Sequence, residues 1–231
     1  MMFLPLQNQK IYQQVASQIQ DMILDGRLKS GDKLPAERSM SEQFKVSRNS
    51  IREAIRALEI LGIVESRQGG GNFIVAGSSD CLFEPLSIMF KLRNGSFSDL
   101  LEIRRGLEME AASLAAQKIT KAHKVRVKEL LEEFKNASGE RESIDLDKKL
   151  HLLIAEISGN AMLSGFLNSI SKLFEQAVRD GRKMILKTFD NNKVLIKMHR
   201  DLCNAITSGK PEAAAKACRR HFDFILDNLK K

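Results

Sequence analysis

The sequence predicts a mainly α-helical protein in two parts: three helices with a β-hairpin, then an all-α antiparallel helical bundle. Two observations support this prediction. Helix-favouring Leu, Ala, Glu and Lys are frequent among the 231 residues, which include no Trp and only four Pro. Runs that favour β-strands flank a glycine-rich turn near residue 70, and no convincing strand signal follows residue 81. With 43% apolar and 29% charged residues, the composition is that of an ordinary globular protein.

Apolar periodicity predicts the first helix over residues 10–25, where Ile11, Val15, Ile19 and Ile23 recur at every fourth position. Glycines then end the helix.

Two further helices are expected between residues 35 and 62. Pro35 is suited to the first turn of a short second helix that ends before residue 45. Ser47 is a suitable N-cap for a third helix, and Gly62 closes it.

The runs 63–66 and 72–75 flank Gln68 and three glycines, which predicts a hairpin. Three helices followed by a hairpin form a winged helix-turn-helix, which we assign to residues 1–76. Residues 77–96 are expected to be a linker and a connecting helix, because the segment around 76–80 is small and polar. Residues 97–231 are assigned to the helical bundle.

Short polar breakers separate the helical patterns of the second half. The expected helices cover residues 82–92, 97–118, 121–137, 143–158, 161–182, 190–207 and 211–229.

Charge and cysteine usage narrow the function classes. The net charge is +8, but residues 1–76 hold 10 Lys and Arg against 8 Asp and Glu, so any DNA binding there depends on where the charges lie. Three cysteines without CxxC spacing indicate reduced thiols, which is typical of the cytoplasm. No apolar run approaches the ~20 residues of a membrane span, and we expect neither a membrane role nor a secretion signal.

Three arginines of the third predicted helix lie four residues apart, at Arg48, Arg52 and Arg56, and share a flank with Asn49. The adjoining face is apolar, with Ile51, Ala54, Ile55 and Leu58. Such a helix fits a DNA major groove, where arginine pairs with guanine or clamps phosphate. The alternative is a solvated face on which Arg52 and Arg56 pair with Glu53 or Glu59.

Neighbouring residues favour the DNA interpretation. The glycines at the hairpin tip allow a close backbone approach to a minor groove or to phosphates. Arg67 and Gln68 offer hydrogen-bond donors beside them, and Arg38 of the second helix is placed to contact a phosphate strand.

The segments "LPAER", "VSRNSIREAI" and "RQGGGNF" resemble, in order, the DNA-binding domain of the GntR family of bacterial transcription regulators. The resemblance spans about 65 residues. It implies that the following residues contact DNA: Arg38, Ser47, Arg48, Asn49, Arg52, Gln68 and Gly69. The role of Arg56, late in the helix, is left open.

One carboxylate and three imidazoles face inward on the predicted helices of the second half. Asp147 and His151 are four residues apart beside an apolar stripe, and His199 and His221 fall within apolar arcs of two later helices. Such a set is a plausible ligand group for a divalent metal. The alternative is that each histidine is a satisfied core residue.

Arg104 falls in the same arc as Leu100, Ile103, Leu107 and Ala111, so it also points inward. A buried guanidinium requires an anion. That anion is Glu108, one turn later, another acid of the bundle, or a bound carboxylate ligand. No further inward Glu is recognised at a spacing that suits general-base chemistry.

Residues 97–225 resemble the FCD effector domain of FadR-type members of the same family, through "DLLEIRRGLEMEAASLAA", Asp-x-x-x-His before "SGN", and the two later histidines. The resemblance implies that Asp147, His151, His199 and His221 hold a metal, often zinc or nickel. It also implies that Arg104 helps to bind a small organic acid, with Asn160 shaping the site.

These features predict a regulator rather than an enzyme: a repressor that binds a pseudo-palindromic DNA duplex as a homodimer and responds to a small carboxylic acid at the metal. The wing resembles the lactate- and pyruvate-responsive branch, so a C2–C4 hydroxy or keto acid is expected. Two alternatives are a metal-dependent enzyme acting on a small organic acid and a DNA binder with a purely structural metal.

Overall fold

The computed structural model describes residues 10–75, 83–137, 139–168, 173 and 192–229. The chain divides into two compact units, residues 1–82 and 83–231. The expected linker segment 76–80 lies outside the described residues, and the connecting helix expected before residue 97 belongs to the second unit.

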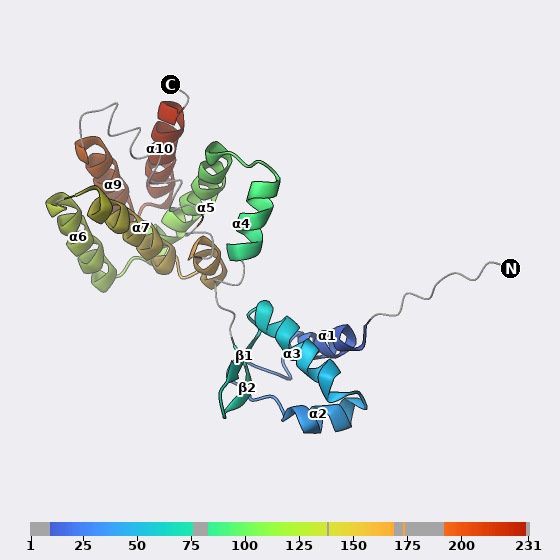
Figure 1. Ribbon diagram of the computed structural model, residues 1–231. Helices are drawn as coiled ribbons and strands as arrows, with labels where there is room; N and C mark the ends of the chain where they lie inside the picture. Colours follow the sequence, from blue (N-terminus) through green and yellow to red (C-terminus); the bar gives the residue numbers. More distant parts are fainter. Residues whose placement is uncertain (1–9, 76–82, 138, 169–172, 174–191, 230–231) are drawn as a thin grey trace. The chain divides into compact units, whose positions relative to one another are not determined.

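The first unit is a winged helix-turn-helix (Figure 1). Its elements are α1 (Ile11–Leu24), α2 (Glu37–Phe44), α3 (Arg48–Ile60), β1 (Val64–Arg67) and β2 (Gly71–Ile74). Helix α3 packs against α1, α2 and β1. The strands pair antiparallel, with Val64 opposite Ile74 and Arg67 opposite Gly71. The predicted layout is confirmed, with element ends shifted by one or two residues.

A single apolar core holds the first unit together. Its fully buried members are Val15, Ala16, Ile19, Leu34, Met40, Ile51, Ala54, Ile55, Leu58, Val64 and Ile74. Two sequence expectations are wrong in detail. Ile11 is half exposed (53%), because it is the first residue of α1. Pro35 precedes Ala36, the N-cap of α2, and so lies outside that helix.

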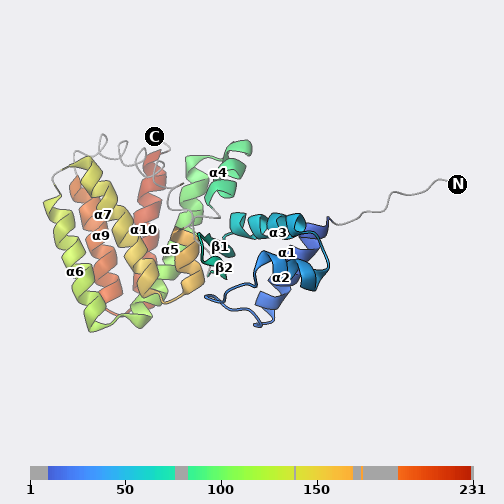
Figure 2. The ribbon, with the colours of Figure 1, turned by 60° about the horizontal axis from the view of Figure 1, so that its bottom comes forward.

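All regular elements among the described residues of the second unit are helices. Its helices are α4 (Phe83–Leu92), α5 (Phe97–Lys118), α6 (Lys121–Asn136), α7 (Glu140–Ile157), α9 (Asn192–Thr207) and α10 (Pro211–Leu229), with a further helical stretch at 161–168. Figure 2 shows α6, α7, α9 and α10 running alongside one another. Helix α5 packs against α7, α9 and α10. The rest of the helix expected over 161–182 lies outside the described residues, apart from residue 173.

Capping residues fix where the bundle helices begin. Ser96 forms a capping box with Asp99 at the start of α5, and Thr120 forms one with His123 at the start of α6. Helix α7 begins at Glu140, three residues before the expected start. None of the described helices is long and apolar enough to cross a membrane. Each of these helices buries one face. Polar residues on that face therefore lie inside the bundle.

Candidate functional site

The first candidate surface is the outer side of α3. Ser47 is the N-cap of this helix, and its hydroxyl accepts a hydrogen bond from the Ser50 backbone N–H at 3.1 Å. Arg48 is therefore the first helical residue. Lys45, in the turn before α3, takes a left-handed conformation (φ 53°) that ends α2. This short turn brings the start of α3 beside α2.

Every residue predicted to contact DNA is exposed. These residues are Arg38, Ser47, Arg48, Asn49, Arg52, Gln68 and Gly69. Arg56 is exposed as well. The opposite face of α3 is buried, as the helical pattern predicts. The structure thus brings a polar, cationic strip of α2 and α3 to the surface of one unit.

Several of these side chains pair with acids of the same unit. Arg52 Nε donates to Glu37 Oε2 at 2.8 Å, and Arg38 Nε donates to Glu42 Oε1 at 3.0 Å. The sequence alternative paired Arg52 with Glu53 or Glu59, and that pairing is wrong for Arg52. Its partner comes instead from α2. Such exposed pairs contribute only about 0–1 kcal/mol, so phosphate or a base can replace the carboxylate.

The hairpin tip supplies the remaining predicted contacts. Gly69 has φ +70°, and the Gly70 N–H closes the turn onto the Arg67 carbonyl at 2.9 Å. The Arg67 guanidinium lies 4.5 Å from the centroid of the Phe73 ring, a cation–π contact that steadies the wing.

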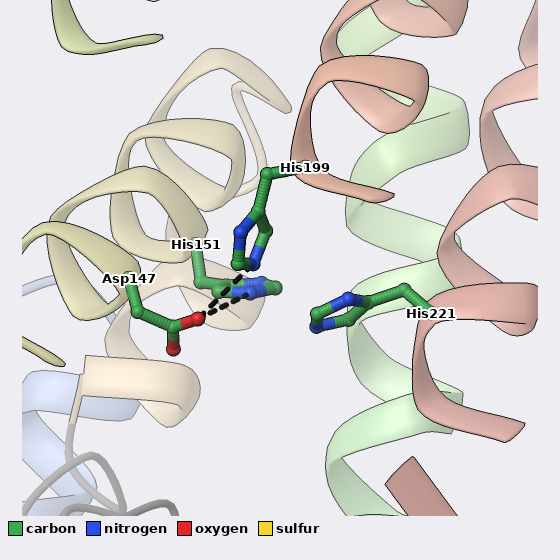
Figure 3. Close-up of side chains that lie close together, drawn as sticks. All are labelled: Asp147, His151, His199 and His221. Carbon is green, nitrogen blue, oxygen red and sulfur yellow. Dashed lines mark ion pairs between the residues drawn. The ribbon is translucent and has the colours of Figure 1, made fainter. Parts of the chain in front are cut away.

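The second candidate site lies inside the helical bundle. Figure 3 shows Asp147 and His151 projecting from α7 toward His199 of α9 and His221 of α10. One ligand atom from each of these four residues lies within 4.8 Å of the others. The Asp147 Oδ1 atom is 3.0 Å from His199 Nε2 and 3.9 Å from His151 Nε2. The structure therefore brings together the residues predicted to bind a metal.

All four side chains are removed from solvent. Their exposed fractions are 0% for His199, 2% for His221, 4% for His151 and 6% for Asp147. The imidazole rings lie close to one another, with centroids 4.7 Å apart for His199 and His221. Phe134 packs against His199 with a centroid separation of 4.8 Å. The cluster is thus a buried polar site packed against an aromatic side chain.

Burial and neighbouring charges set the protonation of this cluster. Burial alone would raise the pKa of Asp147, but His151, His199 and Arg104 outweigh it and hold the pKa well below its usual value. Burial, together with the two neighbouring imidazoles, holds the pKa of His221 well below its ordinary value. Asp147 is therefore anionic and His221 neutral near pH 7, which are the forms that bind metals.

The donor set fits a divalent metal. His151 Nε2 and His221 Nδ1 are buried and have no hydrogen-bond partner among the described residues. A buried nitrogen lone pair without a partner is costly in a protein core. Three imidazoles and one carboxylate suit zinc, nickel and related ions. A bound ion would satisfy these nitrogens.

Arg104 and Glu108 of α5 lie beside the cluster. Arg104 is buried (7% exposed), as predicted, although Ile103 of the expected arc is half exposed. Its guanidinium donates through Nε to Glu108 Oε1, and its Nη2 is 3.9 Å from Asp147 Oδ2. Glu108 also contacts His151 Nδ1. The sequence alternative that Arg104 pairs with Glu108 is confirmed, and Glu108 is only 3% exposed; its contact with His151 was not expected from the sequence.

Two opposing effects act on this ion pair. Burial would raise the pKa of Glu108, but Arg104 and His151 lower it below its usual value. Burial would lower the pKa of Arg104, but Glu108 and Asp147 raise it. Both groups are therefore charged. The spacing of four residues between Arg104 and Glu108 was the signal for their contact; no spacing in the sequence indicated the contact of Glu108 with His151.

Asn160 is not brought into this cluster. It is exposed, and its Oδ1 accepts a hydrogen bond from the Leu163 N–H at 3.1 Å, which caps the helical stretch 161–168. Its backbone N–H donates to the Ser158 hydroxyl at 3.2 Å. Asn160 was expected to help shape an effector site. In the structure its amide oxygen serves as an N-cap instead.

The two free thiols of the bundle, Cys203 and Cys218, are buried. Burial raises the pKa of Cys203 to about 12, so this thiol is protonated and unreactive at neutral pH. Cys81 lies outside the described residues. Neither described thiol belongs to the group of side chains that lie close enough together to share an ion.

Comparison with known proteins agrees with both halves of the structure. Residues 11–74 match the model of bacterial regulatory proteins of the gntR family, and residues 99–224 match that of the FCD domain. The HTH-type transcriptional regulator LutR of Bacillus subtilis is 33% identical over 90% of this chain and 96% of its own. The Glc operon transcriptional activator of Escherichia coli is 31% identical over 93% of this chain and 87% of its own.

A solved structure gives the same result. A GntR protein of Streptococcus agalactiae has a TM-score of 0.62 and 29% identity, and the match covers 94% of this chain and 99% of that one. The family matches cover the winged helix-turn-helix and most of the bundle. The chain therefore belongs to the GntR family of bacterial transcription regulators, with a DNA-binding winged helix-turn-helix followed by an FCD domain.

Proposed function

We propose that this regulator is a metabolite-responsive repressor that binds a pseudo-palindromic DNA operator as a homodimer in the cytoplasm. Its effector is a small carboxylic acid, with a C2–C4 hydroxy or keto acid as the expected class. The effector binds beside a divalent metal, zinc or nickel, held by Asp147, His151, His199 and His221.

The DNA interface is assigned to α3, α2 and the wing. Ser47, Arg48, Asn49 and Arg52 are exposed at the start of α3, the part of a recognition helix that meets base edges. Arg38 contacts a flanking phosphate. The tip at Gln68 and Gly69 reaches the minor groove, where a glycine allows close approach.

The observation that carries the effector proposal is the buried cluster. Three imidazoles and a carboxylate offer ligand atoms within 4.8 Å of one another, and two of the imidazoles have a nitrogen without a partner among the described residues. When bound, a divalent ion supplies a Lewis-acid centre for carboxylate and hydroxyl or keto oxygens. Arg104 lies beside Asp147 and offers the positive charge that binds and orients a carboxylate.

Regulation requires that the effector prefer one conformation of the dimer. A ligand that binds all conformations equally shifts no equilibrium, so the effector must contact the FCD domain differently in the DNA-bound and free forms. The metal-dependent enzyme considered from the sequence is not retained, since the family consists of transcription regulators.

Calorimetry of metal-loaded protein against a panel of short carboxylates, followed by fluorescence anisotropy with operator DNA, tests the proposal. We expect one acid to bind and to weaken DNA binding at least tenfold. His199→Ala should abolish metal binding, while His123→Ala, at a histidine on α6 outside the cluster, should not. An acid that strengthens DNA binding would contradict release of the operator by the effector. Metal binding with no response to any acid would favour a purely structural metal.

A further inference from the structure

Glu108 of α5 joins two functional side chains inside the bundle. Its Oε1 accepts a hydrogen bond from Arg104 Nε, and its Oε2 contacts His151 Nδ1. The carboxylate is only 3% exposed, so water does not compete for these contacts. Both oxygens of Glu108 are therefore committed, one to the guanidinium and one to the imidazole.

The contact with His151 determines which ring nitrogen faces the cluster. A carboxylate at Nδ1 favours the tautomer that carries its proton there, which leaves the lone pair on Nε2. That Nε2 atom lies 3.9 Å from Asp147 Oδ1 and has no hydrogen-bond partner among the described residues. The ring is thus turned so that its basic nitrogen points toward the other three ligand side chains.

The contact with Arg104 connects the same carboxylate to the predicted effector residue. Arg104 Nη2 is 3.9 Å from Asp147 Oδ2, so its guanidinium lies between two buried acids. A carboxylate ligand that binds Arg104 would have to share the guanidinium with Glu108 or displace it. Either event changes the hydrogen bonding of Glu108, and Glu108 in turn holds His151.

We propose that Glu108 is a positioning residue that orients His151 for metal binding and couples the metal site to Arg104. The inference rests on the proposed function, because it presupposes that the cluster binds a metal. It assigns Glu108 no contact with the metal. Its role is exerted through the ring of His151 on one side and the guanidinium of Arg104 on the other.

Cobalt(II) binding to the full-length protein tests this inference. Co²⁺ accepts imidazole and carboxylate ligands, and its visible absorption reports the geometry of its ligands. We expect Glu108→Gln to weaken Co²⁺ binding about 10- to 100-fold, the usual effect of losing such an outer partner, and to shift the absorption bands. Glu110→Gln, at an exposed glutamate of the same helix, is the matched control and should change neither.

A double-mutant cycle separates coupling from general disruption. We expect Arg104→Gln to alter Co²⁺ affinity in the wild-type background and to have a smaller effect when Glu108→Gln is already present, because only its direct action on Asp147 then remains. If Glu108→Gln alone fails to fold because Arg104 loses its counter-charge, the double variant, which removes both charges, should fold and retain the weakened binding and shifted spectrum.

Three results would overturn the inference. Wild-type affinity and spectrum in folded Glu108→Gln would exclude the positioning role, while leaving the metal site intact. Strictly additive effects of the two substitutions would exclude the coupling. A wild-type protein that binds no Co²⁺ would overturn the proposed metal site itself, and the inference with it.

Discussion

The guanidinium of Arg52 on α3 is joined to the carboxylate of Glu37 on α2 by a 2.8 Å ion pair, yet the Arg52 side chain remains 60% exposed. The pair links α2 to α3 across the turn between them. It engages only the Nε atom of the Arg52 guanidinium. The two terminal nitrogens of Arg52 make no hydrogen bond within the described part of the chain. Arg52 is thus oriented by its own protein and still presents donors to a ligand.

Loss of this side chain should weaken operator binding. Arg52→Ala is expected to reduce specific DNA affinity about 10- to 100-fold, the usual range for an arginine that contacts a base. Arg219→Ala, at an exposed arginine of α10, removes the same charge outside the first unit and serves as the control. Anisotropy titrations at fixed salt measure both. Equal affinities for the two variants would contradict the assignment of α3 to the major groove.

A side chain at Gly69 should destabilise the wing tip. Its φ of +70° is a left-handed conformation, so Gly69→Ala should lower the free energy of unfolding of the first unit by about 1 kcal/mol. Tyr12, the only tyrosine of the chain, packs against the core of that unit, and its fluorescence in urea reports this unfolding.

Gly106 lies within α5 with open space at its Cβ position. Gly106→Ala should instead raise the free energy of unfolding of the second unit by about 1 kcal/mol. Circular dichroism during urea unfolding measures this change.

The metal-free bundle should lose stability as the pH falls below about 6.5. The pKa of His221 is held well below its ordinary value in the folded state by burial and by the neighbouring His199 and His151, despite the opposing charge of Asp147. Below this pH the unfolded chain binds a proton at His221 that the folded chain does not bind. The free energy of unfolding should therefore fall by up to about 1.4 kcal/mol per pH unit.

Urea unfolding of chelator-treated protein between pH 7.5 and 5.5 measures this dependence. His221→Phe removes the titrating ring and should flatten the profile. A profile that is flat in the unsubstituted protein would show that the imidazole is protonated in the folded chain as readily as in the unfolded one.

Effector response should depend on the forked shape of Arg104 as well as on its charge. Arg104→Lys keeps a cation opposite Glu108 but cannot bind a carboxylate through two parallel hydrogen bonds. We expect at least tenfold weaker acid binding by calorimetry, with metal affinity retained within about threefold. Arg105→Lys is the control, because Arg105 faces away and pairs with Asp223 at 2.7 Å. Comparable losses in both variants would contradict a specific role for Arg104.

Sequence periodicity was sufficient for most of the architecture. The spacing of Ile51, Ala54, Ile55 and Leu58 predicted the buried face of α3, and Ser47 predicted where that helix begins. The inward positions of the cluster histidines followed from the same reasoning, because residues on one stripe of a helix share an environment.

Contacts between helices were beyond the reach of that reasoning. The pairing of Glu37 with Arg52 depends on the angle between α2 and α3, and the contact of Glu108 with His151 depends on how α5 packs against α7. Periodicity within one helix carries no information on either. Asn160 shows a related limit, since a short polar residue after a glycine suits a helix cap as well as a ligand contact.

The four side chains of the buried cluster come from three helices that are distant in sequence. An ion shared by α7, α9 and α10 would act as a cross-link, because it joins segments whose separation in the denatured chain is otherwise limited only by the residues between them. The intact bundle would then resist proteases far better with the ion than after chelation. Cellular lifetime of this regulator would accordingly follow metal supply, independently of any acid it senses.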